Sequence, residues 1–357
     1  DLADDPVNNR WRDAFPGGGF TLERANYTAG VAARFIGAPQ VFYSRRVSSY
    51  YENLAHANMP QWSDGNTWSL DSHTGAPAGD WPREGDIAII GVGGTGGGGG
   101  GPRHHVAYRA TDNYSPARVE INRSASINSW PPRLFIEEGA TFNMGKVDGN
   151  GTLEVRLDPS SPSTITGDFG AFSKRGGEGA RVLYHCEAGA VVEIPQVTNE
   201  YPQVRLEGGG NREMYFPEAV TINDTLIVDY QATLRPRYDI HVKHDLRLGN
   251  YNEGTLEFPD DVEVTVTIDG NLRLTSDNDT EVRVENDGSN PALNHRLIVK
   301  GDINLLRGNR FDLWNGNGAN DDNCILELQG EQNTSLNNDD NMPVELYKLV
   351  VNKGQDQ

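Results

Sequence analysis

A short pattern of alternating apolar residues around a three-residue turn recurs along this chain. Each copy reads apolar, any, apolar, three turn-like residues, apolar, any, apolar, as in Val266–Leu274 around Asp269–Asn271. Alternation on both sides of a turn of fixed length predicts two short strands, each with one face buried. The first apolar pairs of the seven copies are Val119/Ile121, Leu134/Ile136, Tyr184/Cys186, Val220/Ile222, Ile240/Val242, Val266/Ile268 and Leu297/Val299.

The spacing of the last four copies predicts a solenoid. Their second strands begin at Leu226, Leu246, Leu272 and Ile303, which lie 20, 26 and 31 residues apart. A repeat this short cannot bury its apolar face alone, so it must stack on its neighbours. We therefore expect an all-β fold, a parallel β-helix (β-solenoid) with irregular coil lengths and one copy of the pattern per coil. An antiparallel sandwich of short strands is the alternative.

The solenoid interpretation makes specific predictions about neighbours in space. Val242 should lie beside Ile268, and Leu246 beside Leu272, as inward ladders along the stack. Ile268→Asp should then disrupt the stack, whereas the outward Arg273→Asp should cost little.

Composition supports an elongated body with a thin core. Hydrophobic residues make up 36% of the chain and aromatic residues 8%, with 41 Gly and 19 Pro, which is too polar for a large round core. The 31 basic and 51 acidic residues give a net charge of -20, which repels nucleic acid and anionic membranes. No stretch is long and apolar enough to cross a membrane. Neither nucleic acid nor membrane insertion is therefore expected.

Two regions are expected along the chain. Residues 1–60 show no clear period and predict a mostly irregular N-terminal segment with one short helix over Leu22–Ile36. Residues 61–357 predict the solenoid, in which Pro82–Gly91 reads as a turn followed by an alternating strand. The chain opens at Asp1 without a signal peptide and stops just after an apparent strand. We expect a processed or partial chain whose solenoid continues beyond residue 357.

The two cysteines and the glycine run carry no obvious chemistry. Cys186 and Cys324 form no disulfide framework or metal-site spacing, and Cys186 occupies an apolar position of the repeat, so we expect it to be buried. The run Gly93–Gly101 lacks the Lys and Ser/Thr that a phosphate loop needs at the start of its helix. It predicts a flexible loop.

Residues 60 to 354 resemble large surface proteins that Bacteroidota export through the type IX secretion system, many of them associated with gliding or adhesion. The motifs that carry the resemblance are the Trp-rich Gly65–Ser69, the strand Gly85–Ile90, the turn Asp269–Leu272 and the segment Leu346–Gly354. The glycine loop is longer than in that family, and no type IX sorting domain ends the chain. The resemblance implies a secreted or cell-surface location. Its implied partners are surface or secretion-system proteins, extracellular polysaccharide, or further copies of the chain.

One polar cluster invites an enzymatic interpretation. Parallel β-helix polysaccharide lyases and hydrolases place Asp, Lys or Arg on one outer face for acid–base chemistry on sugars. The next coil offers only Asp269 as an acidic group at the equivalent positions, which favours a solvated outer face. The cluster consists of His241, Lys243, His244, Asp245 and Arg247.

Two further sets of residues are candidates for binding. An Asn/Asp-rich loop packs oxygen ligands as Ca²⁺ prefers, without EF-hand spacing, and such segments are also common turn formers. Ca²⁺ is the only cofactor that the sequence suggests. Trp62, Trp68, Trp81 and Trp130 could supply stacking faces for sugars, but we expect them to cap the first coil. The candidate Ca²⁺ ligands are Asn315, Asn317, Asn320, Asp321 and Asp322.

The sequence therefore favours a non-catalytic structural or adhesive module of a larger exported protein. A carbohydrate-active β-helix enzyme and a carbohydrate-binding module are the alternatives from other functional classes.

Overall fold

The computed structural model divides the chain into two compact units, Asp1–Gln40 and Val41–Gln357. It describes residues 2–5, 10–13, 21–23, 39–45, 59–91, 104–123, 132–187, 191–209, 212–276, 280–285, 293–307, 310–314, 322–339 and 342–354.

The first unit contains a small antiparallel sheet. Its strands β1 (Leu2–Asp5), β2 (Arg10–Asp13) and β3 (Thr21–Glu23) pair in the order β1-β2-β3. The helix predicted over Leu22–Ile36 therefore starts inside a strand, and its residues 24–36 lie outside the described part of the chain. β2 and β3 pair antiparallel, from Arg10 with Glu23 to Arg12 with Thr21.

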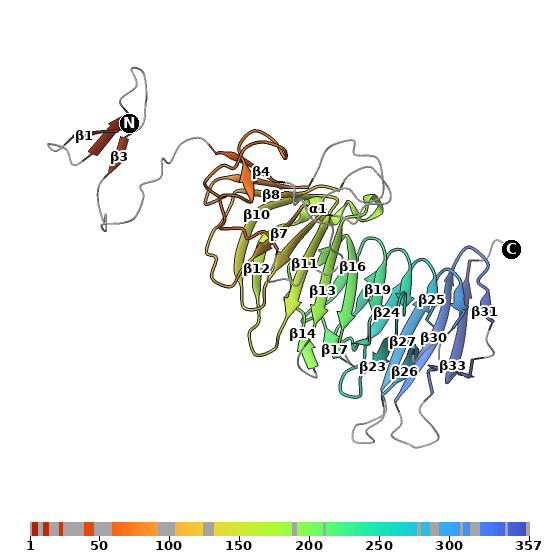
Figure 1. Ribbon diagram of the computed structural model, residues 1–357. Coiled ribbons are helices and arrows are strands. Elements are labelled where there is room, and N and C mark those ends of the chain that lie inside the picture. The colour runs from red at the N-terminus through yellow and green to blue at the C-terminus, as the bar shows by residue number, and fades with distance from the viewer. Residues whose placement is uncertain are drawn as a thin grey trace. The chain divides into compact units, whose positions relative to one another are not determined.

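The second unit is a parallel β-solenoid, which confirms the predicted fold class (Figure 1). Between its named strands all pairings are parallel except that of β4 with β5. Its first coils alternate between two sheets, here called sheet I and sheet II. Sheet I contains β4 (Val41–Ser44), β5 (Trp68–Ser69), β6 (Ile87–Ile90), β8 (Arg118–Ile121), β10 (Thr141–Gly149) and β12 (Thr164–Asp168).

Sheet II runs through the whole solenoid with ten strands. These strands are β7 (His105–Tyr108), β9 (Arg133–Ile136), β11 (Thr152–Leu157), β13 (Arg181–Cys186), β16 (Gln203–Gly208), β19 (Leu226–Asp229), β22 (Leu246–Leu248), β25 (Leu272–Leu274), β28 (Ile303–Leu305) and β31 (Leu336–Asn338).

After helix α1 (Gly170–Ser173) and the 3-10 turn η2 (Gly176–Glu178), each coil visits three sheets, namely sheet II, sheet III and sheet IV. Sheet III contains β14 (Val191–Glu193), β17 (Arg212–Tyr215), β20 (Ala232–Leu234), β23 (Gly254–Phe258), β26 (Glu281–Val284), β29 (Arg310–Asp312) and β32 (Val344–Glu345). Sheet IV contains β15 (Glu200–Tyr201), β18 (Val220–Ile222), β21 (Ile240–Val242), β24 (Thr265–Ile268), β27 (Asn294–Val299), β30 (Asn323–Gly330) and β33 (Lys348–Lys353).

The predicted ladders are present, but the seven copies of the pattern do not share one corner. Val242 pairs with Ile268 and Leu246 with Leu272, as expected. The last four copies turn from sheet IV into sheet II, whereas the Tyr184 copy turns from sheet II into sheet III. The Leu134 copy turns from sheet II into sheet I, and residues 125–127 of the first copy are outside the described residues. The prediction of one copy per coil is wrong, since the first two copies start on β8 and β9, which are consecutive strands of one coil. Any turn between two half-buried strands gives the same alternation, whichever sheets it joins.

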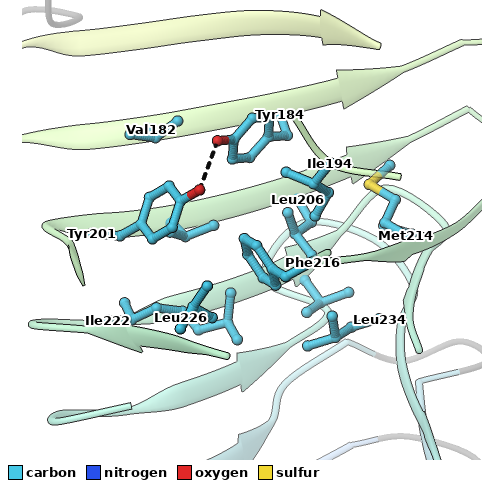
Figure 2. Close-up of a cluster of buried hydrophobic side chains, with 14 of the residues drawn as sticks. Val182, Tyr184, Ile194, Tyr201, Leu206, Met214, Phe216, Ile222, Leu226 and Leu234 are labelled. Carbon is cyan, nitrogen blue, oxygen red and sulfur yellow. Dashed lines mark hydrogen bonds between the residues drawn. The ribbon is translucent and has the colours of Figure 1, made fainter. Parts of the chain in front are cut away.

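The core is a thin column of inward side chains between the sheets. Figure 2 shows Tyr184 and Tyr201, whose hydroxyl groups lie 3.2 Å apart, packed beside Phe216 and Met214. The coils from β6 to β30 contribute Leu, Ile or Val to this column, and Cys186 belongs to it. Cys186 and Cys324 are both buried and free, so the predicted burial of Cys186 is confirmed.

The Trp-rich segment covers the N-terminal edge of the solenoid. Gln61 forms a bridge to β7, the edge strand of sheet II, and β5 pairs with β4 at the edge of sheet I. Trp62 and Trp68 are fully buried, with ring centroids 5.1 Å apart. These contacts confirm the capping predicted for the two residues, while Trp130 lies outside the described residues. Within the described residues, no helix is long and apolar enough to cross a membrane.

Candidate functional site

An open groove of about 560 Å³ lies on the outer face of sheet IV. Its floor is built from outward side chains of successive coils, because Glu200 pairs with Thr221, Thr221 with His241 and His241 with Thr267. The inward residues of the same strands are apolar and buried, so the alternation of each strand places these polar groups outside. Lys300 adds a cation to the wall of the groove.

His241 and Lys300, which line the groove, both interact with Asp269 of the coil between them. His241 Nε2 lies 2.9 Å from Asp269 Oδ2, and Lys300 Nζ lies 2.8 Å from Asp269 Oδ1. Asp269 and Lys300 each occupy the first position of the turn that follows an inward Ile268 or Val299. The stacking of equivalent turns therefore places the carboxylate between the imidazole and the ammonium group.

The carboxylate at the centre of this array is ionised. Partial burial alone would raise the pKa of Asp269, but the hydrogen bonds and charges of Lys300 and His241 hold that pKa below its ordinary value. An ionised carboxylate accepts hydrogen bonds and does not donate a proton. The array therefore offers Asp269 as an acceptor beside His241 and Lys300, with the hydroxyl of Thr221 on the neighbouring strand.

The polar cluster predicted around residues 241–247 divides between different surfaces. His241 lies in the groove, but Lys243 bonds to Asn223 Oδ1 at 2.7 Å, outside the groove wall. His244 Nδ1 lies 3.6 Å from Asp245 Oδ1 and is largely exposed. Arg247 is on sheet II, where its guanidinium lies 3.3 Å from Asp245 Oδ2. The sequence cluster is therefore not one site.

Asp245 is a structural residue that joins consecutive coils. Its side chain is 2% exposed, and its carboxylate accepts hydrogen bonds from the backbone N–H of Asn271 at 3.0 Å and from Asn271 Nδ2 at 3.1 Å. Arg273 lies 3.2 Å away. Burial would raise the pKa of Asp245, but the Asn271 hydrogen bond and the Arg273 charge lower it overall. The side chain thus fixes the turn of the following coil.

The candidate Ca²⁺ loop is described only at its last residue. Asn315, Asn317, Asn320 and Asp321 lie outside the described residues. Asp322 is 5% exposed, and its carboxylate accepts the backbone N–H of Leu293 at 2.7 Å. Within the described residues, no group of three His, Cys, Asp or Glu side chains is arranged to hold a metal ion. The Ca²⁺ prediction for the loop stays a prediction.

The tryptophans offer less sugar-stacking surface than the sequence suggested. Trp62 and Trp68 have no exposed surface, so neither ring can contact a ligand. Trp81 is partly buried against the core, with the Arg83 guanidinium 4.6 Å from its ring centroid.

Sequence reasoning missed the contact between Asp269 and Lys300. The signal was present, because aligning the turns of the last four copies places Asn223, Lys243, Asp269 and Lys300 in one column. Residues of one column stack along a solenoid and can pair across coils.

Comparison with protein-family models, with curated proteins and with solved structures finds no match for this chain.

Proposed function

We propose that this chain is a structural or adhesive module of a larger exported protein, and that the groove on sheet IV is its adhesive surface. The observation that supports this most is the ten consecutively paired strands of sheet II, which make a continuous scaffold. A scaffold of stacked coils repeats its outer surface at about 4.8 Å per coil, so it suits an extended partner.

The chemistry of the groove favours binding over turnover. Asp269 is paired with both His241 and Lys300, so its charge is already compensated before any ligand arrives. Sugar hydrolysis by paired carboxyl groups needs one acid whose pKa is raised, whereas the pKa of Asp269 is lowered. Hydroxyl-rich ligands match the mixed donors and acceptors that remain, such as Thr221 and Thr267.

A carbohydrate-active enzyme is the second candidate, and one observation favours it. Asp269 joins His241 and Lys300, two residues that line the open groove on the outer face of the parallel β-solenoid. A histidine oriented by a carboxylate is a common general base.

Incubation with a panel of acidic and neutral polysaccharides separates these functions. For an adhesive module we expect saturable binding in affinity electrophoresis without new reducing ends or unsaturated products. His241→Ala and Lys300→Met should then weaken binding about tenfold. Lys243→Met is the matched control, because Lys243 occupies the same turn position but does not line the groove.

Turnover that His241→Ala abolishes would overturn the adhesive proposal in favour of the enzyme. Absence of both binding and turnover would remove the adhesive function and leave a structural one.

A further inference from the structure

Two exposed tyrosines lie side by side at the corner between sheets II and III. Tyr230 follows β19 and Tyr251 belongs to the equivalent turn of the next coil, with ring centroids 6.2 Å apart and ring planes 30° apart. Their exposed fractions are 41% and 69%. Large aromatic rings that are held rigidly and left open to solvent are typical of binding surfaces.

The backbone at this corner is strained in a way that the rest of the fold does not require. Tyr230 and Gln231 adopt positive φ angles of 52° and 63°, and they are the only described non-glycine residues that do so. The equivalent turn of the next coil uses Gly249, with φ 68°. Glycine adopts this conformation without strain. A coil with no role beyond stacking would therefore be more stable with glycine in place of Tyr230.

A buried carboxylate holds both tyrosines in place. Asp229 is fully buried and accepts the backbone N–H groups of Tyr230 at 3.0 Å, Tyr251 at 3.0 Å and Asn252 at 2.9 Å. The guanidinium of Arg205 donates to the same carboxylate at 2.8 Å. The two turns are thereby locked together before any ligand binds, which lowers the entropy cost of binding.

The same arginine supports one side of both rings. The Arg205 Cζ atom lies 5.5 Å from the ring centroid of Tyr230 and 5.0 Å from that of Tyr251, within the range of cation–π contacts. Its charge is compensated by Glu207 at 2.7 Å and by Asp229. The rings therefore present their remaining surface to solvent above a neutralised base.

We propose that Tyr230 and Tyr251 form a platform that binds a neutral saccharide chain. Pyranose rings of equatorially linked sugars have an apolar face that stacks on tyrosine. Gln231, Asn252 and Glu253 neighbour the two tyrosines in the sequence and carry amide and carboxylate groups, which bond to sugar hydroxyls. The net charge of -20 and the compensated state of Arg205 disfavour a polyanionic chain. The platform is on a different face from the groove on sheet IV, so it does not depend on the function proposed for that groove.

Binding of cellohexaose and mannohexaose, measured by isothermal titration calorimetry, tests the platform. We expect saturable binding of at least one of them, weakened about tenfold or more by Tyr251→Ala and by Tyr230→Asn. Asn tolerates positive φ, so Tyr230→Asn removes the ring while keeping the turn. Tyr238→Ala is the matched control, because that ring is 49% exposed but lies outside the platform, and it should bind as the unchanged chain does.

Circular dichroism and thermal melting of each variant establish that the solenoid is folded. Failure of both neutral hexasaccharides to bind would overturn the proposal. Binding that survives in folded Tyr230→Asn and Tyr251→Ala variants would also overturn it.

Discussion

Single buried polar residues connect one coil to the next in this solenoid. The buried Asp229 and Asp245 both accept backbone N–H groups of the following coil, and the partly exposed Asp302 accepts that of Ser335 at 2.8 Å in the same way. Each such bond satisfies a turn amide that an apolar neighbour would leave unpaired. In the sequence these aspartates resemble ordinary turn formers, because their partners lie a full coil away.

His295 makes the stability of the C-terminal coils sensitive to acid. It is fully buried, and its Nδ1 atom accepts the backbone N–H of Val264 at 3.3 Å, which requires a neutral ring. Burial lowers the pKa of His295 to about 4, below the value of about 6.5 for an unfolded chain. As the pH falls, the unfolded state therefore takes up the proton before the folded state does. The contribution of His295 to the free energy of unfolding is complete above about pH 6.5 and is lost towards pH 4.

This loss should amount to about 3 kcal/mol in the free energy of unfolding between pH 7 and pH 4. Urea unfolding at several pH values gives the free energy of unfolding of the unchanged chain and of His295→Gln. The loss is the difference between the slopes of this free energy against pH for the two proteins. His244→Gln is the matched control, because it replaces a histidine whose side chain is 63% exposed. An equally steep pH dependence in His295→Gln would show that another group causes the acid sensitivity.

Equivalent inward residues of consecutive coils stack on one another, so a substitution at one of them affects the packing of its neighbours in the coils on both sides. Ile268 lies fully buried between Val242 and Val299 in sheet IV. Ile268→Asp should lower the free energy of unfolding by about 4 kcal/mol or more, because it removes packing and buries a charge without a partner. Ile268→Val should cost only about 1 kcal/mol. Equal urea midpoints for the two variants would contradict this ladder.

Arg273 is outward, as the sequence predicted, but its replacement should cost more than an ordinary surface change. Its Nε atom lies 3.2 Å from the carboxylate of Asp245, whose side chain is only 2% exposed. Arg273→Asp would place a second carboxylate beside it, and we expect a loss of about 1–2 kcal/mol, since partial exposure weakens the repulsion. Arg273→Gln should cost less than half as much in the same urea titration. An Arg273→Asp variant with unchanged stability would instead support the expectation from the sequence that this substitution costs little.

At the scale of the molecule, the sequence correctly predicted a parallel β-solenoid but not the number of sheets that each coil visits. The alternation around Val242 and Leu246 correctly predicted parallel stacking, because only a stacked coil buries both strands. The change from two sheets to three could not be predicted, since a half-buried strand has the same period whichever sheet contains it.

The candidate sites were predictable only in part, for a related reason. His241 was recognised as a polar outward residue, but its array is completed by Lys300, which lies two coils further along the chain. Tyr230 and Tyr251 were missed because their turns are not alike in sequence. Their proximity depends on the buried Asp229 and on a backbone conformation that residue type alone does not predict.

The change in cross-section has a mechanical consequence for a chain under tension. β12 is the last strand of sheet I, and β14 and β15 are the first strands of sheets III and IV, so sheet II alone continues across this boundary. Between β11 and β13, the strand pairing that continues across this boundary consists of six residue pairs. Helix α1 reinforces this boundary, because Phe172 is fully buried and the Ser173 carbonyl accepts Asn223 Nδ2 at 3.1 Å. At this boundary the solenoid is therefore held by one sheet rather than by two or three, and a four-residue helix packs against it.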